Sequence, residues 1–114
     1  MRKYDDIQLS ERERGILRKI LDAARKELPD ATVIFFGSRA RGDAEADSDW
    51  DILVLTEAVD WKIERRVFSA LYQVELDEDI IINTLVIARD NWEYKQFDGH
   101  PMKKNVEKEG VMVA

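Results

Sequence analysis

Apolar residues recur along the first third of the chain with the period of an amphipathic helix. The helical pattern begins after Ser10, which forms a capping box with Glu13, and it ends before Pro29. Its apolar positions are Leu17, Ile20, Leu21, Ala24 and Leu28. This spacing predicts a helix of about five turns that covers one face of the fold.

Three shorter apolar stretches are typical of buried strands: 31–36, 49–55 and 80–87. The first is rich in β-branched and aromatic residues and ends at Gly37. The third is apolar at consecutive positions, which predicts a central strand covered on both faces. Between the first two strands, the polar segment 38–48 is expected to be a loop with a helical turn.

Helical patterns return in the second half of the chain. Asp60 is placed to cap a helix whose inner positions are Ile63, Val67, Ala70, Leu71 and Val74. Asp90 and Glu93 repeat the capping-box spacing and predict a short helix through Phe97. A last helix is expected over 102–109, with Lys103, Lys104 and Lys108 on its exposed face. The order of elements predicts an α/β (α+β) fold, a small mixed sheet with helices packed on it, in one domain over 1–114.

Composition narrows the possible chemistry. The 114 residues are 45% apolar and 37% charged, as in an ordinary globular protein, and contain no Cys. Disulfides, thiolate catalysis and Cys-ligated metals are therefore excluded, and the single His100 argues against a His-based metal site or a Ser–His relay. The net charge of −6 disfavours non-specific nucleic-acid binding, which depends on cationic contacts to phosphate. No apolar run approaches the ~20 residues of a membrane span, so we expect a cytoplasmic protein with no membrane partner.

Two carboxylates with strand spacing suggest a metal site. Asp49 and Asp51 are two residues apart in the second predicted strand, so their side chains should project from the same face. Two neighbouring carboxylates repel each other, and a divalent cation relieves that repulsion. Oxygen ligands with no His or Cys nearby favour Mg²⁺ or Mn²⁺.

The turn after the first predicted strand is suited to phosphate. Gly37 has no Cβ, so a phosphate could approach the backbone N–H groups, and the hydroxyl of Ser38 adds a donor. Arg39 and Arg41 bring two positive charges into the same turn. Together with the acidic pair, this turn predicts a nucleoside triphosphate bound with a metal and used in phosphoryl or nucleotidyl transfer. The alternatives are a ligand-free strand start, an ordinary turn, and arginines that only neutralise the two carboxylates.

These residues form a pattern that resembles a known family. Gly37-Ser38, a spacer of ten residues and Asp49-Trp50-Asp51 are similar to the signature of the DNA polymerase beta-like nucleotidyltransferase superfamily. The fuller pattern, Gly-Ser-Arg-Ala-Arg-Gly followed by Ser-Asp-x-Asp, resembles the minimal nucleotidyltransferase branch, and 100–110 resembles the closing helix of that branch. The resemblance implies the polymerase beta-like nucleotidyltransferase fold.

The resemblance also implies roles for particular residues. Gly37 and Ser38 would hold the β- and γ-phosphates of ATP, the nucleotide donor. Asp49 and Asp51 would be catalytic and would bind Mg²⁺ or Mn²⁺.

The resemblance is less specific about the two arginines, and the chain departs from the family pattern at one position. Arg41 would lie near phosphate, and Arg39 would be partly structural. The superfamily usually has a third carboxylate on a later strand, where Asn83 stands in this chain. An amide oxygen can bind a metal, but a neutral amide cannot take a proton, so this position bears on catalysis more than on nucleotide binding.

The branch implied by the resemblance suggests a biological role. Its members often act as the antitoxin of a HEPN-domain ribonuclease toxin, and some transfer AMP to a tyrosine of that partner. The chain is therefore expected to transfer a nucleoside monophosphate, AMP from ATP, to a hydroxyl of a macromolecular acceptor such as a HEPN toxin. One alternative is a catalytically impaired nucleotide- or partner-binding antitoxin. Another is an enzyme that modifies small molecules, although such enzymes generally carry an extra domain.

Overall fold

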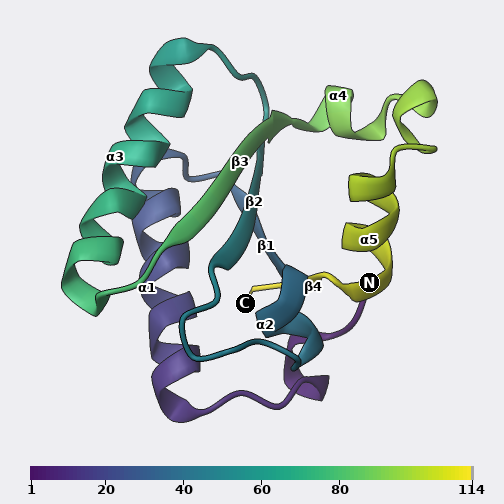
Figure 1. Cartoon of the computed structure of the whole chain (residues 1–114). Coiled ribbons are helices and arrows are strands. Elements are labelled where there is room, and N and C mark those ends of the chain that lie inside the picture. Colours follow the sequence, from purple (N-terminus) through teal and green to yellow (C-terminus); the bar gives the residue numbers. More distant parts are fainter. Residues whose placement is uncertain (114) are drawn as a thin grey trace.

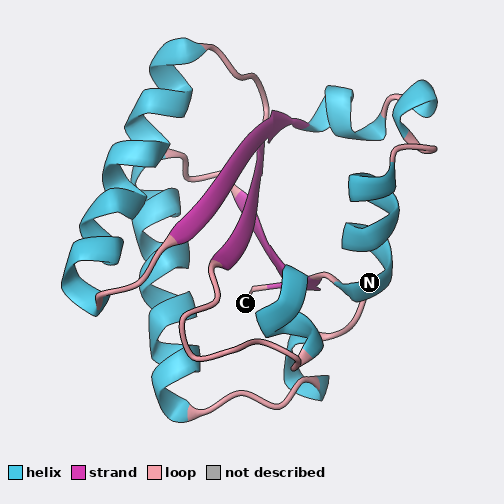
Figure 2. Cartoon of the chain, viewed as in Figure 1, coloured by secondary structure: helices cyan, strands magenta, loops and turns pink. Residues whose placement is uncertain are grey.

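The computed structural model describes residues 1–113 and shows a four-stranded sheet between two layers of helices (Figures 1 and 2). The elements are η1 (Tyr4–Asp6), α1 (Glu11–Glu27), β1 (Thr32–Phe36), α2 (Gly37–Arg41), β2 (Trp50–Thr56), α3 (Trp61–Glu78), β3 (Ile82–Ala88), α4 (Arg89–Glu93), η2 (Lys95–Phe97), α5 (Pro101–Glu109) and β4 (Val111–Met112). No helix in this part of the chain combines the length and the apolar character needed to cross a membrane.

The sheet is mixed, and its strand order is β3-β2-β1-β4. β1 pairs antiparallel with β2 and with β4, whereas β2 and β3 are parallel and are joined by α3. The predicted class, a small mixed sheet with helices packed on it, is therefore confirmed. β4 has only two residues, too few for the apolar pattern to reveal it.

Each face of the sheet has its own apolar core. α1 and α3 cover one face, where Trp50 and Phe35 are fully buried and stack with their ring centroids 5.6 Å apart. α4, η2 and α5 cover part of the other face, where Trp92 and Val106 pack on Leu53. Of the two carboxylates predicted to bind metal, Asp51 lies on β2 at this second, more open face, and Asp49 immediately precedes the strand.

Helix starts follow the predicted caps in two of three cases. Ser10 and Glu13 form the capping box of α1, and the side chain of Asp60 accepts a hydrogen bond from the N–H of Ile63 at the start of α3. The predicted Asp90–Glu93 box is wrong. Because β3 continues through Ala88, α4 starts at once at Arg89, which places Asp90 inside its first turn with no side-chain cap. The helix also ends at Glu93, and a separate 3-10 turn follows it.

The prediction that the third strand is central is also wrong. β3 lies at the edge of the sheet, with β2 on one side only. Consecutive apolar residues indicate that both faces of a strand are apolar, but strand pairing uses the backbone at its edges, which the apolar pattern does not report. Leu85, in the middle of this strand, is accordingly 39% exposed.

Lys103, expected on an exposed face, is instead buried beneath the second layer of helices. Its side chain is only 6% exposed, and its Nζ donates to the carbonyl oxygen of Trp92 and, at 2.6 Å, to a carboxylate oxygen of Asp98. The ammonium group also lies 5.4 Å from the centre of the Trp92 ring. These contacts hold α5 against the segment that connects it to β3.

We expect Lys103→Met to lower the free energy of unfolding by about 1–3 kcal/mol, because it leaves the buried carbonyl of Trp92 without a donor. Lys104→Met is the matched control. Lys104 is exposed, so this change should alter stability by less than ~0.5 kcal/mol. Urea denaturation of both variants measures the difference, and equal stabilities would contradict a structural role for Lys103.

Candidate functional site

The turn from β1 into α2 brings the backbone of Gly37 against Asp51. Gly37 has φ +81°, and a Cβ placed on it would lie 1.9 Å from Oδ2 of Asp51. The register of β1 and β2 causes this approach, since Phe36 pairs with Asp51 and Gly37 is the next residue. Only glycine satisfies both the backbone conformation and the lack of space. Ser38 follows in the first turn of α2, whose N-terminus has no side-chain cap.

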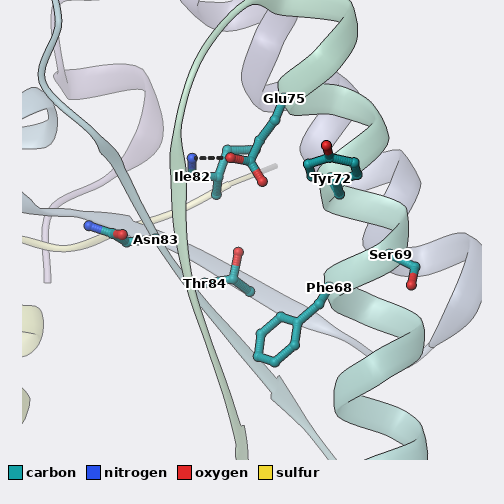
Figure 3. A pocket seen from close by; sticks show the side chains of 7 residues that line it. All are labelled: Phe68, Ser69, Tyr72, Glu75, Ile82, Asn83 and Thr84. Carbon is teal, nitrogen blue, oxygen red and sulfur yellow. Dashed lines mark hydrogen bonds between the residues drawn. The ribbon is translucent and has the colours of Figure 1, made fainter.

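Asp49, Asp51 and Asn83 come together at one end of the sheet. Asn83 pairs with Asp51 in the parallel register of β2 and β3. Its Nδ2 donates to Oδ2 of Asp49 at 3.0 Å and to Oδ1 of Asp51 at 3.1 Å. Figure 3 shows the Asn83 side chain directed away from α3, towards the opposite face of the sheet. The two carboxylates therefore converge on a single point.

The electrostatic environment raises the pKa of one of the two carboxylates. Burial raises the pKa of Asp51, and the nearby charge of Asp49 raises it further, while the hydrogen bond from Asn83 lowers it. Within residues 1–113, neither Asp49 nor Asp51 forms an ion pair with an arginine or lysine. The alternative in which Arg39 and Arg41 simply neutralise the pair is therefore not what the structure shows.

The donor set fits a hard divalent cation. The convergence point of Asp49 and Asp51 now receives the partly positive NH₂ group of Asn83, and a cation there would compensate their charge more fully. No cluster of three or more Asp, Glu, His or Cys side chains suited to a metal occurs in the described residues. The chain would thus supply two carboxylates and one amide oxygen, after rotation of the amide, and phosphate or water oxygens would complete the coordination of Mg²⁺.

Arg39 shapes the loop that leads to the acidic pair. Its Nε and Nη2 donate to the carbonyl oxygens of Ser48 and Ala46, each at 2.9 Å. Its guanidinium also lies 4.8 Å from the centre of the buried Trp50 ring. These contacts fix the end of the 43–48 loop immediately before Asp49.

Arg41 lies at the other end of α2, beside the acidic pair. Its guanidinium binds Asp43 at 3.2 Å and Glu109 at 3.1 Å, and these hydrogen bonds raise its pKa. Glu109, the last residue of α5, was not identified from the sequence. The helix dipole disfavours a carboxylate at the C-terminal end of a helix. The position of Glu109 at the end of the predicted last helix is therefore the sequence feature that could have indicated a cationic partner.

Alanine substitutions at Gly37 and Gly42 separate the effect of the positive φ angle from the effect of the close contact with Asp51. Gly37→Ala should cost about 1–2 kcal/mol in folding free energy and displace the Asp51 carboxylate, thereby weakening Mn²⁺ binding. Gly42→Ala is the control, because Gly42 has φ +88° but no atom within 4 Å of the place that a Cβ would take, so only stability should fall. Calorimetric Mn²⁺ titration of the two variants measures this, and equal Mn²⁺ affinities would contradict the close approach.

Removal of the Asn83 donor should raise the pKa of Asp51 further. In Asn83→Leu the carboxylate keeps its burial and loses the hydrogen bond that favours its charged form. Thr84→Val, on the opposite face of the same strand, should leave the pKa unchanged. Carbon-detected NMR titration of the metal-free protein gives the value, and an unchanged or lower pKa in Asn83→Leu would refute the account.

Two solved structures are similar to this chain in fold. A crystal structure described as a toxin–antitoxin with AMP-PNP is similar to this chain with a TM-score of 0.63 and 18% sequence identity, over 86% of this chain and 72% of that one. A second, of a mutant of the toxin–antitoxin MntA-HpeT, has a TM-score of 0.62 and 16% identity over the same shares. At such identities the likeness shows the fold. Curated protein sequences contain no match.

The family model described as a nucleotidyltransferase domain matches residues 17–113, which include the Gly37-Ser38 turn, the Asp49/Asp51 pair and Asn83. The resemblance to polymerase beta-like nucleotidyltransferases is thereby confirmed, and the minimal branch is consistent with it. The chain belongs to the nucleotidyltransferase domain family.

Proposed function

We propose that the chain is a Mg²⁺-dependent nucleotidyltransferase that transfers AMP from ATP to a hydroxyl group of a macromolecular acceptor. The observation that carries the proposal is the convergence of Asp49 and Asp51 on one point beside the Gly37 turn. Mn²⁺ could replace Mg²⁺, since both prefer oxygen ligands.

Different residues of the site would bind the phosphates of the nucleotide and the metal ion. The Gly37 backbone, with no Cβ in the way, and the Ser38 hydroxyl would bind the β- and γ-phosphates of ATP. A bound divalent ion would supply charge neutralisation at the α-phosphate. Asp49 and Asp51 would hold that ion, together with the amide oxygen of Asn83 after rotation of the amide that donates to both carboxylates in this structure. The oxygen of an acceptor hydroxyl would form a bond to the α-phosphorus and lose its proton to water. The bond between the α-phosphorus and the oxygen that bridges it to the β-phosphate would break, and pyrophosphate would leave.

Arg41 would bind a phosphate of the nucleotide rather than Asp49 or Asp51. Its guanidinium is shared between Asp43 and Glu109 and lies close enough to Asp51 to lower the pKa of that group. In the proposed complex Arg41 exchanges part of these contacts for a phosphate oxygen, because phosphate offers it a charge-assisted hydrogen bond. Arg39 acts indirectly, through the loop it holds.

We further propose that the acceptor is a HEPN-domain toxin and that the chain is its antitoxin. Two solved structures of similar fold are toxin–antitoxin structures, and one of them contains AMP-PNP.

One observation favours a second candidate, a nucleotide- or partner-binding antitoxin that does not catalyse transfer. The amide of Asn83 stands where the superfamily usually has a carboxylate, and it cannot accept the proton of an attacking hydroxyl. In that case neutralisation of the toxin would depend on binding alone.

Mass spectrometry of a HEPN-domain protein encoded beside this chain, incubated with it, Mg²⁺ and each of the four nucleotides, tests the proposal. We expect the partner to gain one or more AMP masses with ATP. Asp49→Asn and Asp51→Asn should each reduce the rate by about 10²-fold or more, because each removes a charged ligand. Asn83→Asp should retain transfer and bind metal more tightly.

Asp47→Asn is the matched control, since Asp47 is an exposed carboxylate in the adjacent loop. It should transfer AMP at the wild-type rate. No mass gain with any nucleotide would exclude the transferase. If Asp49→Asn and Asp51→Asn still neutralise the toxin in cells, the binding antitoxin is the correct function.

A further inference from the structure

β3 presents an unprotected edge. Its seven residues, Ile82–Ala88, pair with β2 on one side only, and no strand among residues 1–113 covers the other side. The strand contains no Lys, Glu, Asp or Pro, the residues with which proteins usually block pairing at an edge. The opposite edge of the sheet, β4, is protected by its length of two residues. A long apolar edge without such protection is expected to be covered in the working protein.

A row of apolar side chains on α3 lies beside this edge. Trp61, Phe68, Tyr72 and Leu76 are 65%, 42%, 58% and 58% exposed, and their spacing places them on one flank of the helix. These four are among the nine large apolar side chains that are exposed in residues 1–113. Such a concentration marks an interaction surface rather than scattered exposure. Leu85, also exposed, lies on the edge strand itself but two residues after Asn83, so its side chain projects from the other face of the sheet.

Two residues of this row, Phe68 and Tyr72, line a groove between α3 and β3. Figure 3 shows Phe68 directed from α3 towards Thr84 of β3, with Tyr72 one turn further along. The groove is lined by Phe68, Ser69, Tyr72, Glu75, Ile82, Asn83 and Thr84. Glu75 closes one end, where its Oε2 accepts a hydrogen bond from the N–H of Ile82 at 3.2 Å.

Charge is distributed along α3 in a way that matches a second copy of the helix. Lys62 and Arg65 lie near its N-terminal end, and Glu75 and Asp79 lie at its C-terminal end. When two such helices lie antiparallel about a point midway between Phe68 and Tyr72, Arg65 of each copy faces Glu75 of the other. A foreign partner would not require this self-complementarity, whereas a two-fold interface does.

We propose that this face binds a second copy of the chain, with β3 pairing antiparallel to β3 and α3 packing antiparallel on α3. A two-fold axis perpendicular to the sheet achieves both pairings at once, because it keeps both α3 helices on the same side. It joins two four-stranded sheets into one continuous sheet. The inference goes beyond the proposed function, since the Asn83 side chain points to the other face and the acidic pair stays open.

Sedimentation velocity of the full chain over a range of concentrations tests the dimer. The wild type should sediment as a dimer at micromolar concentration. Leu85→Lys places a charge at the strand edge and Tyr72→Asp a charge in the groove, and each should raise the dissociation constant by at least about tenfold. Tyr94→Asp is the control, because Tyr94 is also 58% exposed but lies outside this face.

A charge exchange checks the antiparallel arrangement. Arg65→Glu and Glu75→Arg should each weaken self-association, and mixing the two variants should restore dimers, because every contact then joins opposite charges. Circular dichroism confirms that each variant is folded. A wild type that stays monomeric, a dimer insensitive to both Leu85→Lys and Tyr72→Asp, or variants that do not recombine on mixing would overturn the proposal.

Discussion

The carboxylate of Asp51 rests directly on the backbone of Gly37, and the rest of the site depends on this contact. The antiparallel register of β1 and β2 places Phe36 opposite Asp51, so the chain must turn away at the next residue without a Cβ. The same turn starts α2 and leaves its N-terminus without a side-chain cap. One steric constraint thus places the backbone at the start of α2 directly beside a carboxylate of the acidic pair.

Two acidic side chains held this close are unfavourable without compensation. Burial and the charge of Asp49 both raise the pKa of Asp51, while the hydrogen bond from the NH₂ group of Asn83 and the more distant charge of Arg41 lower it. The nearby arginine is engaged elsewhere, because Arg41 binds Asp43 and Glu109. Such an arrangement is costly to keep for stability alone, and titratable groups perturbed in this way are concentrated at functional sites. A divalent ion bound between Asp49 and Asp51 would compensate the repulsion between their carboxylates.

Much of this site could be predicted because it depends on short-range geometry. The spacing of Asp49 and Asp51 determines that both project from one face of a strand, and that geometry needs no knowledge of the fold. The position of Asn83 followed from the alignment of the third strand with its family pattern. The edge position of β3, the burial of Lys103 and the role of Glu109 could not be predicted. Each depends on which backbone edges pair or on contacts between residues distant in sequence, and hydrophobic periodicity carries neither kind of information.

Mn²⁺-induced broadening of the NMR signals of the chain shows whether Asp49 and Asp51 bind a divalent ion beside the Gly37 turn. Added Mn²⁺ should broaden the resonances of Asp49, Asp51 and Asn83 first, and a non-hydrolysable ATP analogue should extend the effect to Gly37 and Ser38 while tightening Mn²⁺ binding. Asp51→Asn should abolish this pattern. Broadening centred on the exposed acidic loop 43–47, or a pattern that survives Asp51→Asn, would contradict the account.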